Sequence, residues 1–588
     1  MAAPTLTRHL SRPRHYVCSG CLRKQRLLAP TKRTVSFAKQ DQAKYVWDAK
    51  AEEIKAGKQK SMLSILEERG FVNAIAGDRD SLDKLMTEKR IGAYVGIDPT
   101  APSMHVGHLL PLMALFWLYV HGFRAVSLMG GATCAIGDPT GRTTSREMQD
   151  SMTRRANING IYMQLKRLWG NVHANAKEWG YDLAWTRAHE LMNNNTWMER
   201  LPFMEVLKVL GPGVRLGAML SRDTVKNKME KGDGMSFAEF SYPLLQAWDW
   251  WHLYNKKKVQ VQIGGSDQYG NIVAGIDAIK YIAKTHTNPD FRWPEKEDPS
   301  LIPYGLTVPL LTTASGQKFG KSAGNAIWLD KDMTSVFELY QFFVRTADAD
   351  AERYLKLFTF LPLDRIRTIM DEHHLAPERR SAQHVLAQEF VELVHGKDEA
   401  KQASTQHRML FSRATERAIQ PLKGEELLND SLETGNSGRS GAINSINPSV
   451  ESSGQSTNAF DAPKPSVTLP RSLVVGQPTA KVLWSAGLVK SRSEGGRLII
   501  SGGAYIGTRP DKVGLKRNEL VWTNATKTGG QLRKSFLIED SLLVLRAGKW
   551  NLKVVKVVSD EEFEALELDA PGWQVLKEQR EPQPAQQA

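Results

Sequence analysis

The segment Tyr94-Val-Gly-Ile-Asp-Pro-Thr-Ala-Pro-Ser-Met-His-Val-Gly-His108 decides how this chain folds. It begins with a short apolar run, which predicts a buried strand. The chain then passes through Pro99 into a helix after His105. Two further strand-like segments, Arg124–Met129 and Val259–Ile263, each run into a pair of glycines. Strands that alternate with long helices predict an α/β fold with a parallel sheet, whose ligands bind at the carboxyl ends of the strands.

Length and composition limit the class of protein further. A chain of 588 residues predicts two to four domains. Hydrophobic residues make up 41% and charged residues 24%, which is enough apolar material for a soluble core. The longest apolar run, Leu109–Val120, contains Pro111 and is shorter than the roughly 20 residues of a membrane span. The 3 cysteines exclude a disulfide scaffold and suit a reducing compartment.

The formal net charge of +14 comes from two separate segments. Residues 1–40 hold 9 Lys and Arg and no acidic residue, with Ser and Thr between them. This composition predicts a mitochondrial transit peptide and therefore the mitochondrial matrix, and the alternative is a basic arm that binds nucleic acid. Residues 466–559 hold 16 basic and 5 acidic residues, whereas residues 560–588 hold 2 basic and 8 acidic residues.

Changes in composition also predict the domain boundaries. The expected parts are a transit peptide (1–40), a helical extension (41–60), a parallel-sheet domain (61–330), an all-helical domain (331–425), a flexible linker (426–466), a small basic α+β module (467–559) and an acidic tail (560–588). Residues 61–90 read as helices, with Gly70 and Gly77 as stops. The linker is rich in Ser, Gly, Asn and Pro and has hardly a large apolar residue.

The motif His105-Val-Gly-His108 opens the first long helix. Two histidines at i and i+3 face the same side, and the N-terminus of a helix attracts phosphate oxygens. Gly107 would let a flat ring approach the backbone. The alternative interpretation is a helix start with two solvent-exposed histidines.

A second motif, Lys318-Phe-Gly-Lys321-Ser322, follows Ser315-Gly316 in a polar loop. Two lysines around a glycine hinge could close on a polyphosphate. Read from Gly316, the motif is one residue short of a P-loop, and no strand runs directly into it, so the P-loop alternative is weak.

Several isolated polar residues lie in apolar surroundings. Tyr242, Gln246 and Asp249 are spaced i, i+4, i+7 and share one face of an apolar helix. That face either meets solvent or lines a pocket, and the tryptophans at 248, 250 and 251 favour the pocket because they indicate that both sides of the helix are covered. Asp138 lies in a second glycine-bounded turn, and Asp267-Gln268 follows a strand and offers a carboxylate and an amide to a ribose.

The two short motifs together resemble the signature sequences of class I aminoacyl-tRNA synthetases. The longer segments Tyr94–His108, Gly137–Gly141 and Gln262–Asn271 are similar to those of the bacterial and organellar tyrosyl-tRNA synthetases, and the extension 41–60 resembles that of the mitochondrial enzymes of filamentous fungi. Met104 and Phe319-Gly320 depart from the usual pattern. The module 467–559 resembles a ribosomal-protein-type RNA-binding domain through Lys490–Arg497.

This resemblance implies a Rossmann-like catalytic domain, a helical anticodon-binding domain and a C-terminal RNA-binding domain. It implies a tyrosine–tRNA ligase that forms tyrosyl-adenylate and pyrophosphate from L-tyrosine and ATP and then transfers the tyrosyl group to mitochondrial tRNA(Tyr). Mg²⁺ would accompany ATP, with no protein-held metal. The resemblance also implies a homodimer, and no membrane partner is expected.

Each matching residue takes an implied role from the resemblance. The residues implied in catalysis are His105, His108, Lys318, Lys321 and Thr100. The residues implied in binding tyrosine are Tyr94, Asp138, Tyr242, Gln246, Asp249 and Gln262, with Tyr94 and Asp249 on the phenol hydroxyl. The residues implied in binding ATP or the adenylate are Asp98, His105, Gly107, His108, Gly265, Asp267, Gln268 and Lys321. The residues implied in binding RNA are Lys490, Arg492 and Arg497.

An alternative function is that of an RNA-binding cofactor for group I intron splicing, alone or beside the synthetase activity. Residues 42–60 carry alternating charges and weak apolar periodicity, so they are expected to add little to a core. They form either a solvated helix or a docking helix for intron RNA, in which Lys44, Lys50, Lys55, Lys58 and Lys60 would meet phosphates.

Overall fold

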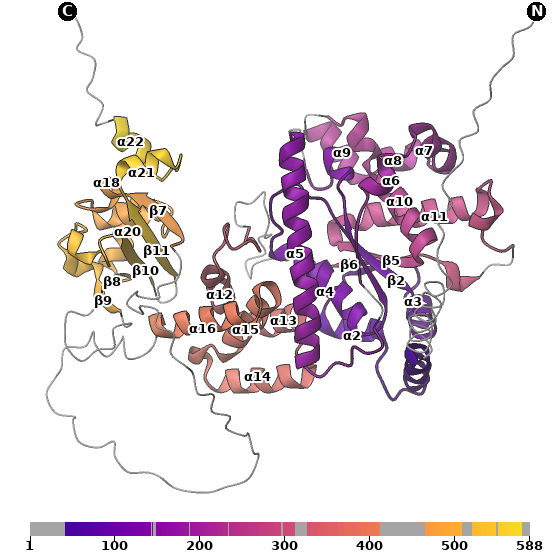
Figure 1. The fold of residues 1–588 in the computed structure, drawn as a ribbon, viewed down its shortest axis with the longest axis horizontal. Coiled ribbons are helices and arrows are strands. Elements are labelled where there is room, and N and C mark those ends of the chain that lie inside the picture. Colours follow the sequence, from indigo (N-terminus) through magenta and orange to yellow (C-terminus); the bar gives the residue numbers. More distant parts are fainter. Residues whose placement is uncertain are drawn as a thin grey trace, which may run out of the picture. The chain divides into compact units, whose positions relative to one another are not determined.

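The computed structural model describes residues 42–142, 144, 149–186, 189–232, 234–295, 298–311, 326–411, 465–508, 520–548 and 551–578. The chain divides into two compact units. The first comprises Met1–Ala326 with Glu352–Arg367, and the second comprises Ile327–Ala351 with Thr368–Ala588. Figure 1 labels the elements along the chain. Within the described residues, no helix combines the length and the apolar character that a membrane span needs.

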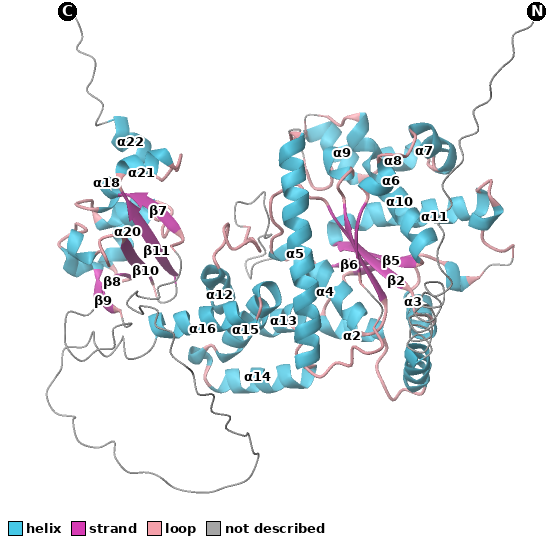
Figure 2. Cartoon of the chain, in the orientation of Figure 1, coloured by secondary structure: helices cyan, strands magenta, loops and turns pink. Residues whose placement is uncertain are grey.

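The first unit is built on a six-stranded sheet of order β1-β6-β5-β2-β3-β4, drawn in magenta in Figure 2. Its strands are β1 (Ala74–Ala76), β2 (Gly92–Ile97), β3 (Arg124–Met129), β4 (Glu190–Asn193), β5 (Val259–Gly265) and β6 (Tyr304–Val308). The pairs between β6, β5, β2, β3 and β4 are parallel, and β1 pairs antiparallel with β6 at the edge. The three strands expected from the sequence are confirmed, whereas the expectation of helices throughout 61–90 was wrong at β1.

The helices of this unit pack on the sheet and on one another. They are α2 (Met62–Arg69), α3 (Arg79–Glu88), α4 (Val106–Val120), α5 (Ser151–Glu178), α6 (Asn195–Met198), α7 (Phe203–Val209), α8 (Leu216–Leu220), α9 (Asp223–Lys231), α10 (Phe237–Lys257) and α11 (Tyr269–Thr285). Helix α4 packs against β2 and β3, and nearly all of its side chains are buried. Helix α10 begins at a capping box of Ser236 and Glu239 and packs against α11.

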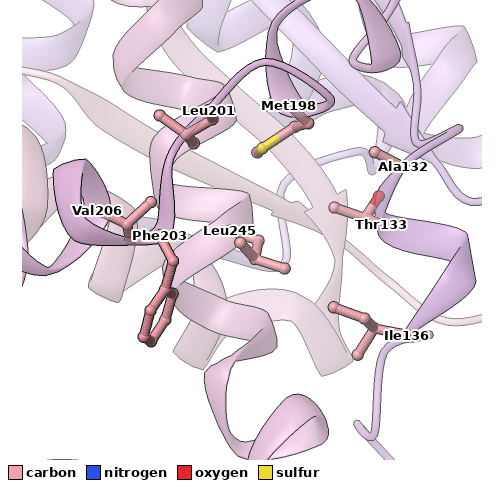
Figure 3. Close-up of a pocket in the computed structure, with 8 residues that line it drawn as sticks. All are labelled: Ala132, Thr133, Ile136, Met198, Leu201, Phe203, Val206 and Leu245. Atoms are coloured by element: carbon pink, nitrogen blue, oxygen red, sulfur yellow. The ribbon is translucent and has the colours of Figure 1, made fainter.

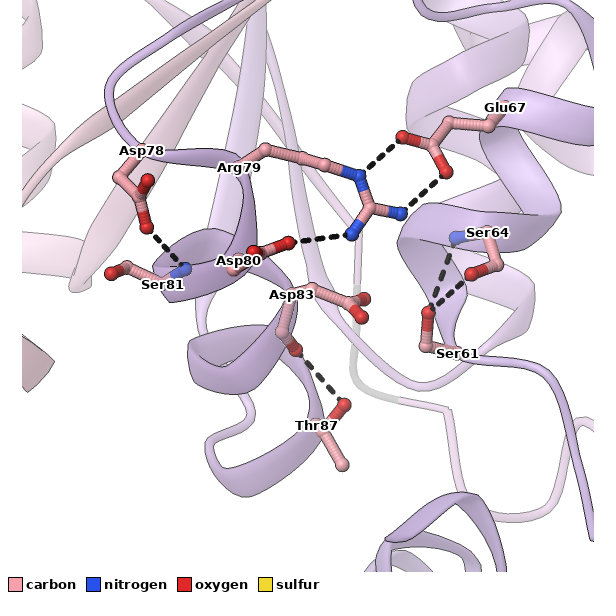
Figure 4. A network of polar contacts seen from close by, with 9 residues as sticks. All are labelled: Ser61, Ser64, Glu67, Asp78, Arg79, Asp80, Ser81, Asp83 and Thr87. Carbon is pink, nitrogen blue, oxygen red and sulfur yellow. Dashed lines mark hydrogen bonds and ion pairs between the residues drawn. The ribbon is translucent and has the colours of Figure 1, made fainter. Parts of the chain in front are cut away.

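Helices α2 and α3 are joined by a polar network (Figure 4). The Arg79 guanidinium donates to both carboxylate oxygens of Glu67, at 2.8 and 2.7 Å. Ser61 and Asp78 cap the N-termini of the two helices, and Gly70 ends α2 in a left-handed conformation with φ of 85°. These caps satisfy backbone groups that a helix end leaves open.

The N-terminal extension corrects an expectation from the sequence. Residues 42–55 form a helix whose Trp47 is only 7% exposed. The Trp47 ring meets Phe123 edge-on at 4.9 Å and lies 6.0 Å from the ring of Trp185. The Lys50 ammonium lies 4.1 Å from the Trp185 ring centre. The extension therefore adds a large aromatic side chain to the core, which its alternating charges had hidden.

The second unit contains a helical part and a small sheet module. Its helices are α12 (Val336–Val344), α15 (Ser381–His395) and α16 (Lys397–Phe411), and α13 (Asp348–Phe358) and α14 (Leu363–Leu375) lie where the chain passes between the units. Helix α12 packs against α15 and α16. The sheet has the order β7-β11-β10-β8-β9, with strands β7 (Val467–Pro470), β8 (Ala504–Thr508), β9 (Val521–Asn524), β10 (Leu542–Ala547) and β11 (Asn551–Val558).

Short helices cover one face of this sheet: α18 (Arg471–Val474), α19 (Thr479–Ser485), α20 (Arg492–Ile500), α21 (Asp560–Ala565) and α22 (Trp573–Glu578). Phe563, Ala570, Trp573 and Leu576 belong to the same hydrophobic core as Leu469 and Val555. The expected boundary at 559/560 was therefore wrong, because the acidic segment folds with the basic module at least to residue 578.

Candidate functional site

The polar residues of the first unit meet at the carboxyl ends of its strands, with Asp98 at the centre. Asp98 follows β2, and its carboxylate accepts a hydrogen bond from the Thr133 hydroxyl at 2.8 Å and another from the Tyr242 hydroxyl at 2.7 Å. A Cβ at Gly130 would lie 1.9 Å from Asp98 Oδ1, so only glycine fits at the end of β3. Three different elements thus fix the orientation of this carboxylate.

Asp249 and Tyr94 form the deepest part of the site. Asp249, on α10, is 4% exposed and accepts hydrogen bonds from Asn194 Nδ2 at 2.9 Å and Trp197 Nε1 at 2.7 Å. Burial raises the pKa of Asp249 to about 7, against the opposing effect of the two donors. The hydroxyl of Tyr94, on β2, is buried and has no hydrogen-bond partner among the described residues. Burial first, and the nearby Asp249 second, raise the pKa of Tyr94 well above its usual value.

A buried hydroxyl without a partner costs about 1–3 kcal/mol, so the protein gains if a ligand supplies the missing hydrogen bond. The carboxylate of Asp249 has acceptor capacity left after its two bonds, and a neutral hydroxyl could donate to it. This end of the site is therefore suited to a group with one hydroxyl that both donates and accepts.

The predicted polar stripe on α10 faces this site. Tyr242 and Asp249 are buried and Gln246 is half-buried. The Gln246 side-chain oxygen accepts from Asn271 Nδ2 at 3.2 Å. Asp138 accepts from Gln268 Nε2 at 2.7 Å. Burial, followed by the charges of Asp98 and Asp138, raises the pKa of Tyr242 well above its usual value.

Gln262, on β5, is also buried, and within the described part of the chain its side-chain oxygen has no hydrogen-bond partner. Gly275 faces it, because a Cβ there would lie 3.6 Å from this oxygen and 2.6 Å from the Trp250 ring. The two carboxylates of Asp98 and Asp138 and the unpartnered Gln262 oxygen are all acceptors, which suits a cationic donor such as an ammonium group.

His105 and His108 cap the N-terminus of α4. His105 Nδ1 accepts from the Gly107 backbone N–H at 3.1 Å, and His108 Nδ1 accepts from the His105 backbone N–H at 3.0 Å. Each ring therefore carries its proton on Nε2, where it can donate to an anion. Burial, together with His105, lowers the pKa of His108 to about 3, so this ring is neutral at physiological pH. The ring centres lie 3.9 Å apart.

The other predicted nucleotide-binding residues follow the strand ends. The Thr100 backbone N–H donates to the Asp98 carbonyl at 2.8 Å. Asp267 is exposed in the turn after β5, and a Cβ at Gly265 would lie 2.6 Å from its Oδ1. Lys318 and Lys321 lie outside the described residues, so the structure brings together only the part of the site formed by the sheet, α4 and α10.

Sequence reasoning missed four residues of the site: Thr133, Asn194, Trp197 and Asn271. Asn194 is fully buried and links helix α10 to the segment after β3. Its Nδ2 donates to Asp249 and to Thr133, and its oxygen accepts from the Ala132 N–H at 2.8 Å. The run Asn193-Asn-Asn-Thr-Trp197 was a usable signal, since three amides after an apolar segment are expensive to bury without partners.

An apolar cavity of about 230 Å³ lies beside this site (Figure 3). It is lined by Ala132, Thr133, Ile136, Met198, Leu201, Phe203, Val206 and Leu245. Its lining offers one hydroxyl and no charged group, so we place the catalytic groups in the polar site. Thr133 belongs to both, and the cavity therefore borders the polar site there. Within the described ranges, no group of three or more His, Cys, Asp or Glu could hold a metal ion.

The predicted RNA-binding residues gather on the second unit. Lys490, Arg492 and Arg497 are exposed on α20 or just before it. The Arg492 guanidinium lies 4.9 Å from the ring centre of Trp484. An exposed guanidinium held over an aromatic face suits contacts with phosphates and bases.

Comparisons with known proteins agree with this geometry. Residues 86–412 match the family model of class I tRNA synthetases (W and Y), and residues 457–575 match that of the tyrosyl-tRNA synthetase C-terminal domain. The chain therefore belongs to the class I tRNA synthetases.

Its relatives place it more narrowly, beside the mitochondrial tyrosyl-tRNA synthetases of fungi. A mitochondrial tyrosine–tRNA ligase of Podospora anserina is 43% identical, covering 96% of this chain and 87% of that protein. The corresponding protein of Saccharomyces cerevisiae is 37% identical over 60% of this chain and 70% of its own length. The crystal structure of a C-terminally truncated Aspergillus nidulans mitochondrial tyrosyl-tRNA synthetase matches with a TM-score of 0.59 and 54% identity, over 63% of this chain and 99% of that one.

Proposed function

We infer that this chain is a tyrosine–tRNA ligase, which activates L-tyrosine with ATP and transfers the tyrosyl group to tRNA. The observation that carries the inference is the buried Tyr94 hydroxyl without a partner beside the Asp249 carboxylate. A tyrosine phenol would donate to Asp249 and accept from Tyr94, which satisfies both groups at once. Phenylalanine would leave the Tyr94 hydroxyl without a partner and would offer Asp249 no further donor, so the pocket rejects it.

The acceptor side of the pocket would hold the ammonium group of tyrosine. Asp138, Tyr242, Gln246 and Gln262 are the proposed contacts, and they lie on elements that the sheet and α10 hold in place. In the structure Gln268 Nε2 donates a hydrogen bond to Asp138, and the Tyr242 hydroxyl donates one to Asp98. Tyrosine binding would therefore exchange these internal hydrogen bonds for bonds to the ammonium, with Asp98 and Gln268 left to hold the adenylate.

Catalysis of the first step needs no protein nucleophile, because the carboxylate of tyrosine attacks the α-phosphate of ATP directly. His105, with Thr100, would hold the γ-phosphate through Nε2, and His108 would orient the adenylate over Gly107. Lys318 and Lys321 would stabilise the leaving pyrophosphate, and Gly265 and Asp267 would hold the ribose. These groups lower the barrier by positioning and by charge stabilisation. Mg²⁺ would accompany ATP as part of the substrate.

The RNA partner would be held in part by α20, through Lys490, Arg492 and Arg497.

We also propose a homodimer, because the segment from α7 to the start of α10 exposes large apolar side chains that a soluble monomer rarely leaves uncovered. These are Phe203, Met204, Leu207, Leu216, Leu220 and Phe237.

The basic, acid-free residues 1–40 lie outside the described residues, and we propose that they direct the protein to the mitochondrial matrix.

The structure favours no second function in intron splicing. Three of the five lysines expected to meet RNA phosphates are engaged: Lys55 pairs with Glu52, Lys60 pairs with Glu68, and Lys50 lies over Trp185. We therefore propose the ligase alone.

The two steps of the reaction separate in one experiment. Tyrosine-dependent exchange of pyrophosphate into ATP reports adenylate formation without tRNA, and attachment of labelled tyrosine to tRNA reports the whole reaction. Lys321→Ala should slow exchange while sparing tyrosine binding, because the loop acts mainly in the transition state. Arg492→Ala with Arg497→Ala should reduce charging and leave exchange intact. Loss of both activities in the arginine variant would contradict the assignment of α20 to RNA.

A further inference from the structure

The sheet of the second unit has a second apolar face, which contacts helix α12 of the helical part. Leu520, Trp522, Ile538, Val544, Leu552 and Val554 form this cluster, and Phe337 of α12 is one of its members. Phe337 is 5% exposed. An aromatic side chain buried to this degree removes a large apolar area from water, which favours the packed arrangement.

Polar contacts surround the buried phenylalanine. Lys553, on β11, donates to Glu338 Oε1 at 2.6 Å, and both side chains are about one quarter exposed. The other oxygen of Glu338 closes the capping box of α12, where it accepts from the Ser335 N–H at 3.3 Å and from the Ser335 hydroxyl at 3.2 Å. Arg345, at the end of α12, donates to Asn551 Oδ1 at 3.1 Å.

Lys556 lies on the same strand and provides a contrast. It is exposed and pairs with Glu562 of α21, within the sheet module itself. The two lysines therefore differ in their ionic partners, which are Glu338 of α12 for Lys553 and Glu562 of α21 for Lys556. The ion pair with α12 is made by Lys553 and not by Lys556, so it is not a general property of basic residues on this strand.

We propose that this contact, here called the α12 joint (Phe337, Glu338, Arg345, Asn551 and Lys553), holds the sheet module in place for tRNA. The proposal rests on the proposed function, in which α20 of the module contacts RNA. The segment 426–466 has the composition of a flexible linker. A module attached by such a linker alone would have to lose its orientational freedom when tRNA binds, whereas the joint removes that freedom beforehand. Glu338 and Lys553 are then positioning residues for tRNA, with no part in adenylate formation.

The test uses charge reversal at the joint in the full-length protein. Lys553→Glu places two acids face to face, and we expect tRNA affinity and the charging KM for tRNA to worsen about tenfold, with pyrophosphate exchange unchanged. The double variant Glu338→Lys with Lys553→Glu restores opposite charges and should recover most of the loss. Lys556→Glu is the matched control, since it makes the same change of net charge on the same strand without touching α12.

Two further variants separate the possible failures. Ser335→Ala weakens the cap of α12 but keeps the Lys553 contact, so unchanged tRNA affinity there excludes a simple loss of helix stability. If Lys553→Glu and Lys556→Glu weaken tRNA binding equally, or if the double variant fails to recover, the joint has no positioning role. If the Arg492 and Arg497 variants also bind tRNA normally, the assignment of α20 to RNA fails, and the proposed role of the joint fails with it.

Discussion

Replacing Asp249 by asparagine should stabilise the protein at high pH while it removes the ability to use tyrosine. Burial raises the pKa of this carboxyl from 3.8 to about 7. An acid whose pKa is higher in the folded protein than in the unfolded chain does not reduce the free energy of unfolding at pH values below the unfolded pKa. The cost grows as pH rises toward the folded pKa and is complete above it. The shift of about 3 pKa units corresponds to roughly 4 kcal/mol at pH 8 and under 2 kcal/mol at pH 5.

Asparagine carries no charge at either pH, but it also offers one acceptor oxygen where the carboxylate offers two. Either Asn194 or Trp197 then loses its partner, at a cost of about 1–3 kcal/mol that does not depend on pH. The stability of Asp249→Asn relative to the parent protein should therefore rise by roughly 2–3 kcal/mol between pH 5 and pH 8. Urea denaturation at the two pH values measures this difference, with exposed Asp277→Asn on α11 as the control.

Activity provides the second half of the same prediction. The phenol of tyrosine loses a charged acceptor, so kcat/KM for tyrosine in pyrophosphate exchange should fall at least tenfold. A stability difference that is the same at pH 5 and pH 8 would refute the buried, ionising carboxylate. Normal use of tyrosine by the variant would refute its place in the pocket.

Four further outcomes are expected. Tyr94→Phe should lower kcat/KM for tyrosine about tenfold and raise the relative use of phenylalanine, as measured by exchange with each amino acid, because the site then has no unpartnered hydroxyl to satisfy. Lys228→Ala should destabilise the protein by about 3–5 kcal/mol in urea denaturation, because it leaves the Glu239 carboxylate buried without its ammonium partner. A smaller loss of stability in Lys228→Met would show that packing of the side chain matters more than the ion pair. Trp47→Ala should lower the melting temperature and leave exchange unchanged, because the side chain packs near the amino ends of β2 and β3, away from Asp98. Affinity for tRNA should fall steeply as salt rises, and a flat salt dependence would exclude phosphate contacts by α20.

The centre of the fold could be predicted because its signals are local. The segments at β2, β3 and β5 are apolar and end in glycine, and parallel strands with both faces covered are expected to look like this. The short strands β1, β4 and β6 lacked such a signal. Strand β1, for example, has three residues, and its pairing with β6 joins segments more than 200 residues apart. Pairing at such a separation depends on the completed fold, which no local pattern encodes.

The site could be predicted to the extent that its residues lie in distinctive motifs or on one helical face. Tyr242 and Asp249 were found from their spacing on α10. Asn194 was missed because its role depends on contacts with Thr133 and Asp249, which come from distant segments. The hydrogen bond from Tyr242 to Asp98 could likewise not be predicted, since sequence spacing cannot show which of several polar groups will pair.

Trp47 shows how charge patterns can mislead. The extension 42–60 alternates in charge, which is typical of a solvated helix. One buried tryptophan changes that interpretation, because a single large aromatic side chain removes more apolar area from water than several small ones. The acidic segment after residue 559 behaves in the same way, since Phe563 and Trp573 anchor it to the core of the module.

Pyrophosphate exchange with a panel of amino acids tests the central claim most directly, namely that Tyr94 and Asp249 form a pocket for a tyrosine phenol. The purified full-length protein should exchange pyrophosphate into ATP with L-tyrosine, and phenylalanine and tryptophan should support little or no exchange at the same concentration. Asp249→Asn should lose the activity with tyrosine and gain none with tryptophan. Exchange with tryptophan, or equal exchange with tyrosine and phenylalanine, would contradict the pocket described above.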